Sequence, residues 1–531
     1  MYYKTKHGRI VAYRLLLSKK IRMLLNCRYY EKPDTIRLGG LYMNEKKGFF
    51  QKIGTRLSGI FGVIGAWFKK FGVAVTKGDI FVKLSLLIMG AQHFRRKQII
   101  KGIIMTLFEV VIIAYTALVG IPYIGKLGTL GTVEREIIFN METMQNETND
   151  YDHSFKILLF GIISVIVLLV AIFIWMNNVI HAYKLQKAAE AGEHINTFVE
   201  DVKDLFDESF HKTLLFFPCL GVVVFTIVPL LVMISVAFTE YDKAHIPPAA
   251  LFSWVGFENF VSLFSDSVSL TFGYTFRKIL VWTLVWAVFA TLTTYLGGIL
   301  LSLLINHKNT KCKKLWRTLF VIAIAVPQFV TLLLVRNFFA DAGIVNTICT
   351  KAGITEFLQD IGILKANMHY IPFLTDPTWA KVMIILINIW IGVPYLMLIA
   401  TGVLMNIPED LMEAARIDGA NKFQIFRKIT MPYMLSVTGP YLVTQFVSNI
   451  NNFNVIYLLT QDVYVTKDQM LANSSGKEID LLVTWLFRLT QEEYNYKMAS
   501  VIGIMVFAIC ALFTLVAFTR MTSGDKEDAF R

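Results

Sequence analysis

Amide side chains occur in two long apolar stretches near the C-terminal end of the chain. Residues 378–405 hold Asn388, and residues 434–459 hold Gln445, Asn449, Asn451, Asn452 and Asn454. Amides donate and accept hydrogen bonds without carrying charge, whereas an ion pathway usually carries carboxylates or basic groups. This chemistry favours recognition of a neutral, hydroxyl-rich ligand such as a sugar. The alternative is that the amides bond between helices, and we favour it for Asn451 and Asn454.

The first of these stretches also contains residues that interrupt an aliphatic helix. They are Asn388, Trp390, Gly392, Pro394 and Tyr395. Pro394 removes one backbone hydrogen bond and can bend the helix, which a membrane tolerates where protein or water satisfies the exposed carbonyls. The pattern therefore predicts a cavity beside this helix, and the ring of Tyr395 would cover the apolar face of a sugar.

A charged hairpin at residues 406–433 separates the two stretches. Its sequence runs Glu413, Ala414 and Ala415, three residues, Gly419, nine residues, Ile429, one residue, and then Met431 and Pro432. Pro408 suits the first turn of a helix, and the two acidic residues after it complement the positive helix N-terminus. Gly419 suits the left-handed conformation that ends such a helix. A second helix is expected from about Lys422 to Pro432.

The whole chain has the composition of a membrane protein. Its 531 residues are 55% hydrophobic and 17% charged, with a mean hydropathy of +0.54, whereas soluble domains are about 25% charged. A spanning helix needs about 20 mainly apolar residues. Eight stretches qualify: 102–123, 156–178, 213–238, 278–305, 316–338, 378–405, 434–459 and 498–519. We therefore predict an all-α polytopic membrane protein with about eight transmembrane helices.

Charge predicts the orientation of the chain. Residues 1–101 hold 22 of the 52 Lys and Arg residues and only four acids, so the positive-inside rule places the N-terminus in the cytoplasm. Eight spans return the C-terminus to the same side. We expect residues 1–101 to form a basic cytoplasmic region, with a helix at about 58–94 lying in the inner membrane surface or forming a small folded cap. Residues 102–211 would be an accessory pair of spans with an inner linker.

Several other classes of site find no support in the sequence. The five cysteines have no paired spacing, so neither a disulfide framework nor a metal site is expected. The basic charge is better explained by topology and attraction to anionic lipid than by nucleic-acid binding. No cleavable signal peptide is expected. Glu109, inside the first span, is a functional candidate by default, but we favour a structural partnership with a basic or amide group on a neighbouring helix.

The hairpin spacing resembles the EAA loop of ABC importer permeases, with Met431 where that pattern has Leu. The resemblance implies that residues 212–531 form a six-helix ABC permease transmembrane domain. It also implies that the hairpin docks into a cleft of a separate cytoplasmic ATPase. The residues expected to couple the two proteins are Glu413, Ala414, Ala415, Asp418, Gly419 and Pro432. The chain has no G-x-x-x-x-G-K-[ST] phosphate loop. We therefore expect that it is not an enzyme and needs no cofactor, and that the partner ATPase binds and hydrolyses ATP.

The resemblance extends to the amide-rich helices. Counted from Glu413 without gaps, Asn388, Gly392, Tyr395, Asn449 and Asn452 coincide with residues that contact maltose in maltose permeases of this family. Two further contact positions differ, because Gln445 stands where Ser is found and Ser448 where Phe is found. These seven residues are the expected substrate-binding set. A maltose or maltooligosaccharide substrate is favoured over other α-linked oligosaccharides.

The resemblance also implies partners in the cytoplasmic membrane. They are an ATPase dimer, a second and different permease subunit, and an extracytoplasmic sugar-binding protein, although symmetry alone would equally allow a homodimer. Two other functions compete with this interpretation. One is an ATP-independent secondary transporter, which would need ion ligands or proton carriers in the core. The other is a non-transporting assembly or sensor subunit that only binds an ATPase.

Overall fold

The computed structural model describes residues 49–141, 144–265 and 271–522. The chain divides into two units, residues 1–63 and 64–531. Of the first unit, only the beginning of a long helix is described, so the expectations for residues 1–48 lie outside the described residues. Apart from residues 49–63 of that helix, the elements below lie in the second unit.

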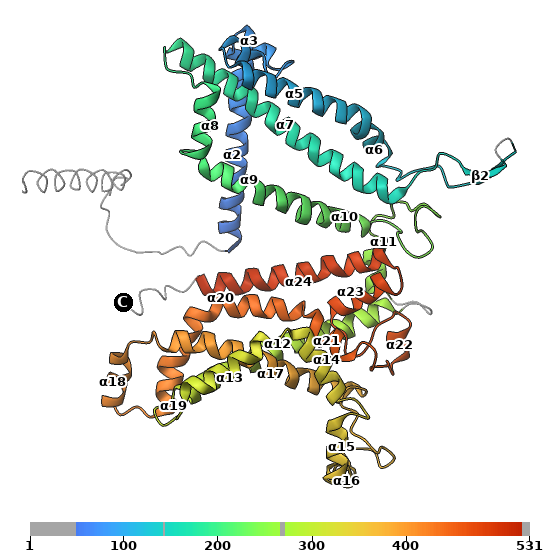
Figure 1. The fold of residues 1–531 in the computed structure, drawn as a ribbon, viewed down its shortest axis with the longest axis vertical. Helices are drawn as coiled ribbons and strands as arrows, with labels where there is room; N and C mark the ends of the chain where they lie inside the picture. Colours follow the sequence, from blue (N-terminus) through green and yellow to red (C-terminus); the bar gives the residue numbers. More distant parts are fainter. Residues whose placement is uncertain (1–48, 142–143, 266–270, 523–531) are drawn as a thin grey trace, which may run out of the picture. The chain divides into compact units, whose positions relative to one another are not determined.

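The elements before the main transmembrane domain are mostly helical (Figure 1). They are α2 (Phe49–Lys77), α3 (Ile80–Leu84), α4 (Ala91–Arg95), α5 (Ile99–Tyr115), the π-helix η1 (Thr116–Gly120), α6 (Ile121–Lys126), β1 (Ile137–Asn140), β2 (Gln145–Thr148), α7 (Ser154–Glu190) and α8 (Phe198–Phe206).

The main domain continues with further helices. They are α9 (Phe210–Val222), the π-helix η2 (Val223–Ile227), α10 (Val228–Val236), α11 (Glu258–Phe264), α12 (Phe272–Asn306), α13 (Lys313–Ala325), α14 (Gln328–Phe338), α15 (Ile344–Lys351), α16 (Ile354–Asp360), α17 (Pro377–Leu404), α18 (Glu409–Ile417), α19 (Lys422–Ile425), the π-helix η3 (Phe426–Thr430), α20 (Met431–Ile450), α21 (Phe453–Thr460), α22 (Gln469–Ala472), α23 (Leu482–Gln491) and α24 (Tyr496–Thr522).

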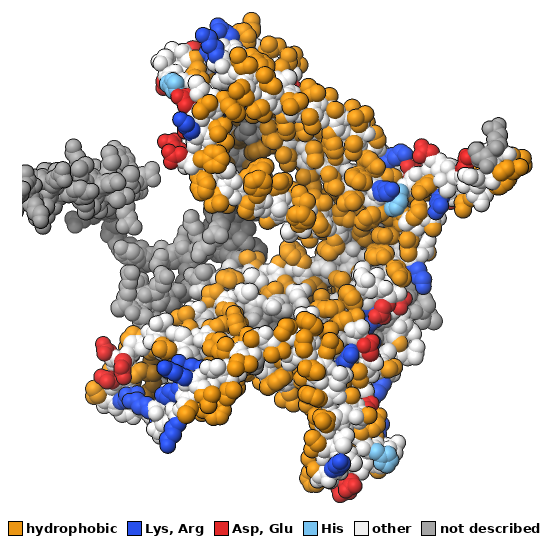
Figure 2. Space-filling model, viewed as in Figure 1, with side chains coloured by type: hydrophobic (Ala, Val, Ile, Leu, Met, Phe, Trp, Pro, Cys, Tyr) orange, Lys and Arg blue, Asp and Glu red, His pale blue; other side chains and the backbone are white. Residues whose placement is uncertain are grey.

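Six helices in the described chain are long and apolar enough to cross a membrane, so the protein is a multi-pass membrane protein. They are Ile99–Lys126, Ser154–Glu190, Phe210–Val236, Phe272–Asn306, Pro377–Leu404 and Tyr496–Met521. Apolar side chains cover the surfaces of these helices in Figure 2, while charged side chains gather toward their ends. The all-α prediction is confirmed, apart from one two-stranded hairpin among the described residues.

The prediction of eight continuous spans is not confirmed, because two of the predicted stretches are interrupted. The stretch 316–338 divides into α13 and α14 at Val326 and Pro327, where the backbone becomes extended. The stretch 434–459 divides into α20 and α21 at Asn451 and Asn452. A proline restricts the residue before it to extended conformations, and asparagine side chains compete for backbone hydrogen bonds. Both pairs still run in the direction of a span (Figure 1).

The segment before the first span packs on α7. The indole Nε1 of Trp67 donates to the Asn177 Oδ1 at 3.1 Å, and the Trp67 ring stacks on Phe173 with centroids 5.4 Å apart. Glu109 accepts a hydrogen bond from the Met89 backbone N–H at 2.8 Å. This contact joins α5 to the segment between α3 and α4, and it supports the structural interpretation of Glu109.

The centre of the main domain is the close packing of α12 against α17. A Cβ atom built on Gly298 would lie 2.6 Å from the Leu396 Cβ and 2.9 Å from its carbonyl carbon, and one on Gly297 would lie 2.7 Å from the Val393 side chain. Glycine therefore allows the two backbones to approach, as small residues do between membrane helices. This contact fixes the relative height of the polar residues on both helices.

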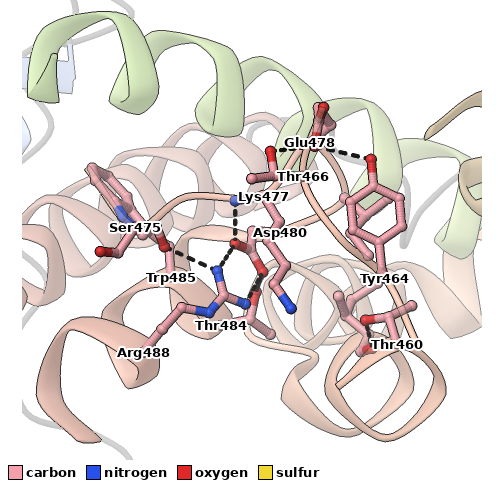
Figure 3. Close-up of polar contacts among 12 residues, drawn as sticks. Thr460, Tyr464, Thr466, Ser475, Lys477, Glu478, Asp480, Thr484, Trp485 and Arg488 are labelled. Carbon is pink, nitrogen blue, oxygen red and sulfur yellow. Dashed lines mark hydrogen bonds and ion pairs between the residues drawn. The ribbon is translucent and has the colours of Figure 1, made fainter. Parts of the chain in front are cut away.

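Hydrogen-bonded carboxylates hold the loop between α21 and α23 in place (Figure 3). The Glu478 carboxylate accepts from the Tyr464 hydroxyl at 2.9 Å, from the Thr466 hydroxyl at 2.7 Å, and from two backbone N–H groups at 2.8 and 2.9 Å. The Asp480 carboxylate is 2% exposed and pairs with Arg488 through bonds of 2.5 and 3.1 Å. Four donors on the Glu478 carboxylate favour its ionised form.

Replacing Glu478 with Gln should destabilise the folded protein at neutral pH by about 2 kcal/mol, because hydrogen bonds to a charged group contribute about 1.5–3 kcal/mol. Burial acts to raise the pKa of the Glu478 carboxyl, but the bonds from Thr466, the Lys467 N–H and Tyr464 outweigh it, and the pKa lies below its ordinary value. The charge therefore stabilises the fold above the unfolded pKa of about 4.3. Its contribution is lost as the pH falls through the lower folded pKa.

The measurement is the thermal unfolding midpoint of the purified protein and the Glu478→Gln variant at several pH values. The difference between the two should be constant from about pH 6 to 8 and shrink below about pH 4.3. The matched control is Glu356→Gln, since Glu356 is exposed on α16. A difference as large at pH 3.5 as at pH 7 would contradict the ionised role of Glu478.

Candidate functional site

The coupling hairpin forms a free-standing helix between two spans. Helix α18 has no buried residue, and the side chain of its last residue, Ile417, is 85% exposed. Gly419 has φ +77°, and the Ala420 N–H bonds to the Ala415 carbonyl at 2.9 Å. This is the left-handed helix end expected from the sequence. In Figure 1, α18 projects beyond the ends of the neighbouring spans.

Of the residues predicted to couple with an ATPase, Glu413, Ala414 and Ala415 lie on this projecting helix. Asp418 and Gly419 directly follow its end, and Pro432 lies in α20. Glu413, Ala414 and Asp418 are exposed and Ala415 is half-buried. Within the described residues, the Glu413 side chain makes no hydrogen bond or ion pair. A carboxylate, two small residues and an apolar end therefore lie on a surface that another protein can contact.

The second half of the hairpin differs from its prediction. Helix α19 begins at Lys422 with a capping box between Asn421 and Gln424, continues through the π-helix η3, and runs into α20. Pro432 therefore lies in the first turn of α20 and does not end a helix. The wider π-turn before it accommodates a residue that cannot donate a backbone hydrogen bond. Pro408, expected in the first turn of α18, instead occupies the N-cap position.

The predicted amide site faces α12. The Asn449 Nδ2 donates to the Thr291 hydroxyl at 2.9 Å, and the Asn388 Nδ2 donates to the Thr294 hydroxyl at 3.4 Å. Asn449 is 2% exposed and Asn388 is 9% exposed. In the part of the chain that the structure describes, neither Oδ1 atom accepts a hydrogen bond. Each asparagine thus keeps an acceptor for which a sugar hydroxyl is suitable.

Gly392 and Tyr395 lie on the same side of α17 as Asn388. A Cβ atom on Gly392 would be 2.5 Å from the Thr294 methyl group, so only glycine allows this approach to α12. The Tyr395 side chain is 49% exposed, and its ring centroid lies 6.5 Å from that of Tyr441. The Tyr441 hydroxyl donates to the Gln445 Oε1 at 3.0 Å. Two aromatic rings and an amide therefore line one accessible surface.

The remaining predicted residues lie near the break between α20 and α21. Ser448 is exposed, whereas Asn452 is half-buried and accepts from the Val455 N–H at 3.4 Å as the cap of α21. Asn451, expected to be structural, donates to the Val447 carbonyl at 3.1 Å and to the Cys510 Sγ of α24 at 3.7 Å. The structure therefore groups Asn388 with Asn449 against α12, and places Ser448 and Asn452 beside the helix break.

Sequence reasoning missed the hydroxyl partners of the amides. Thr291 and Thr294 are three residues apart on α12, so they share a face, and both are buried. The Trp286 indole also donates to the Asn449 backbone carbonyl at 3.0 Å. Threonines in an apolar helix carry little signal by themselves, but their spacing on one face would have suggested a polar contact.

Comparison with known proteins gives consistent matches. Residues 295–521, which include α17, α18 and α20, match the family described as binding-protein-dependent transport system inner membrane component. The chain is 32% identical over 446 residues to the maltodextrin transport system permease protein of Streptococcus pneumoniae, covering 83% of this chain and 96% of that protein. It is also 32% identical over 445 residues to the galactooligosaccharides transport system permease protein of Bacillus subtilis, with coverages of 83% and 97%. A chain in the crystal structure of a bacterial alginate ABC transporter aligns with a TM-score of 0.45 and 24% identity, covering 59% of this chain and 94% of that one.

Proposed function

The chain belongs to the family of ABC importer permeases that form the inner membrane component of binding-protein-dependent transport systems, and from this premise we propose that it imports maltodextrin-type sugars. The observation that carries the proposal is the exposed helix α18 joined to two helices that bear an amide-lined site. Neutral amides and aromatic rings fit a sugar, and relatives transport maltodextrin or galactooligosaccharides by name. Other oligosaccharides remain the alternative substrate.

Helix α18 is proposed to receive the movement of a separate ATPase dimer. Since α18 offers a single docking helix while a dimer offers two clefts, a second permease subunit is part of the proposal. ATP would bind and be hydrolysed in the ATPase, and this chain would catalyse no reaction. Closure of the ATPase would move α18 as a rigid body and shift the balance between inward and outward openings.

The proposed orientation places α18 and both termini in the cytoplasm, in agreement with the basic N-terminal region. An extracytoplasmic sugar-binding protein would deliver the substrate at the opposite end of the spans. The cytoplasmic membrane of a bacterium is the proposed location, with lipid as the surrounding partner and no nucleic acid involved.

The test is transport by the purified complex in proteoliposomes. The complex, with this chain, a second permease and the ATPase, should accumulate labelled maltotriose only with ATP inside and the binding protein outside. Unlabelled galactooligosaccharide in excess should not compete if the substrate is of the maltodextrin type. Uptake driven by an ion gradient without ATP would instead support a secondary transporter, and binding of the ATPase without any uptake would support a sensor subunit.

A further inference from the structure

A two-stranded hairpin between α6 and α7 is exposed on both faces. Strands β1 and β2 pair antiparallel with Ile137 opposite Thr148 and Phe139 opposite Asn146. Every described strand residue is exposed except Asn140, which is half-buried. In Figure 1 the hairpin extends away from the helices that it connects. We refer to the described residues 132–141 and 144–151 as the outer hairpin.

The outer hairpin is apolar along one strand. Ile137, Ile138 and Phe139 follow one another and are 66%, 54% and 54% exposed, and Met141 beyond them is 82% exposed. Successive strand residues point to opposite faces, so apolar side chains cover both faces of β1. Each of the three strand residues lies opposite a polar residue of β2, and no apolar cross-strand pair offsets their exposure.

The base of the hairpin, in contrast, is held firmly. The Asp152 carboxylate is 7% exposed and accepts hydrogen bonds from the Lys126 ammonium at 2.6 Å, the Thr132 N–H at 3.0 Å and the Val133 N–H at 3.3 Å. Leu130 is fully buried with residues of α7 and α10, and the Trp254 indole donates to the Leu127 carbonyl at 2.9 Å. The base of the hairpin is therefore fixed to the helices, while its strands are exposed.

A lone two-stranded hairpin is marginally stable in water. Exposed apolar side chains on an anchored element are typical of an interaction surface. The low stability of this strand pair and its exposed apolar side chains both favour a partner that covers it.

The chain order places this hairpin on the side opposite α18. Helix α17 ends at Leu404 beside the coupling hairpin and begins at the opposite side, at Pro377. Counting back through α13 with α14, then α12, α9 with α10, and α7, the loop between α6 and α7 lies on the same side as Pro377. If α18 contacts the ATPase, the outer hairpin faces the extracytoplasmic space.

Charge favours a protein partner over the membrane surface. Residues 132–152 contain six acidic side chains and one basic side chain. Figure 2 shows acidic side chains along the stem of the hairpin and apolar ones near its end. Anionic lipid headgroups attract basic segments and repel acidic ones. The surface that matches this hairpin is an apolar patch bordered by Lys and Arg.

We propose that the outer hairpin is a docking element for the extracytoplasmic sugar-binding protein, which would contact it through an apolar patch with a basic border. This inference rests on the proposed function. The hairpin is smaller than the 20–30 residues that each partner usually contributes to a stable interface. The hairpin would therefore form part of a larger contact surface and strengthen the binding of the sugar-binding protein to the permease.

The test uses the complete complex with ATPase and second permease in nanodiscs. The probe is the sugar-binding protein from the same organism that stimulates ATP hydrolysis by the unsubstituted complex, loaded with maltotriose. The double variant Ile138→Thr with Phe139→Thr keeps residues suited to strands and removes apolar surface. The half-saturating concentration of the binding protein should rise about tenfold, while ATP hydrolysis without the binding protein stays unchanged. Gln145→Thr, a change between polar residues on β2, should leave both values unchanged.

A second measurement leaves the strands intact. A photoreactive benzoylphenylalanine in place of Met141 should crosslink to labelled binding protein. An excess of unlabelled binding protein should reduce the yield of that labelled crosslink. An unchanged half-saturating concentration, or a crosslink to lipid or to the second permease, would overturn the docking proposal while sugar transport continues. If no binding protein stimulates even the unsubstituted complex, the proposed function itself fails, and this inference fails with it.

Discussion

Replacing Glu413 with Lys is expected to lower ATP-dependent sugar uptake by about 100-fold, because the change reverses a charge at the centre of the exposed helix that we propose docks on the ATPase. Central interface residues contribute about 2–4 kcal/mol when altered, which corresponds to about 30-fold or more in affinity. Glu413 makes no ion pair within the described residues, so the fold gains nothing from its charge. Uptake into proteoliposomes and co-purification of the ATPase are the two measurements.

The control for this change is Glu356→Lys, the same reversal at an exposed position on α16 at the opposite end of the spans. It should leave uptake and ATPase retention at their normal values. The Glu413→Lys protein should still insert and purify, because α18 contains no buried residue. If that variant retains the ATPase and transports normally, α18 is not the coupling element.

Helices α17 and α20 connect the hairpin at residues 406–433 with the amide site. From Asn388 to Leu404, α17 runs for 16 residues, or about 24 Å at the usual rise of 1.5 Å per residue. Four residues separate Leu404 from the start of α18 at Glu409, and α20, which carries Asn449, begins after α18 and α19. Because continuous helices join α18 to both asparagines, the proposed displacement of α18 would reach both sides of the proposed amide site.

Local chemistry made part of this arrangement predictable from the sequence. The glycine end of α18 follows from Gly419, which permits the left-handed conformation, while Pro408 marks the start of the helix to within one position. The six continuous spans follow from length and hydropathy. These features depend on residues close together in the chain.

The rest depends on contacts between distant residues, which one sequence does not reveal. Pro432 was expected to end a helix, but the π-helix before it accommodates the ring, and that choice depends on packing around α20. The pairing of Asn449 with Thr291 joins residues 158 positions apart. The carboxylate of Glu478 is held by donors whose only common feature is their place in the folded loop.

The amide site can be separated from its support by a double-mutant cycle. In Asn449→Ala, the amide is removed. In Thr291→Val, the amide stays but loses the hydroxyl that orients its Nδ2. If the asparagine binds sugar and the threonine positions it, the double variant should resemble Asn449→Ala alone, because the two changes act on one contact. Thr291→Ser retains the hydroxyl and should restore most of the loss.

Asn449→Ala should raise the sugar concentration that half-saturates uptake about 30- to 100-fold, because a site that hydrogen-bonds a hydroxyl strongly penalises loss of that bond. Asn452→Ala should have a smaller effect in the same direction, since its Oδ1 already caps α21. Asn451→Ala is the matched control: it removes an amide two residues away whose hydrogen bonds, among the described residues, go to Val447 and Cys510. If Asn449→Ala leaves the maltose-stimulated ATP turnover equal to that of the unsubstituted complex, the asparagine serves only to join α20 to α12. If all three variants have the same half-saturating sugar concentration, the sugar site lies in another part of the permease.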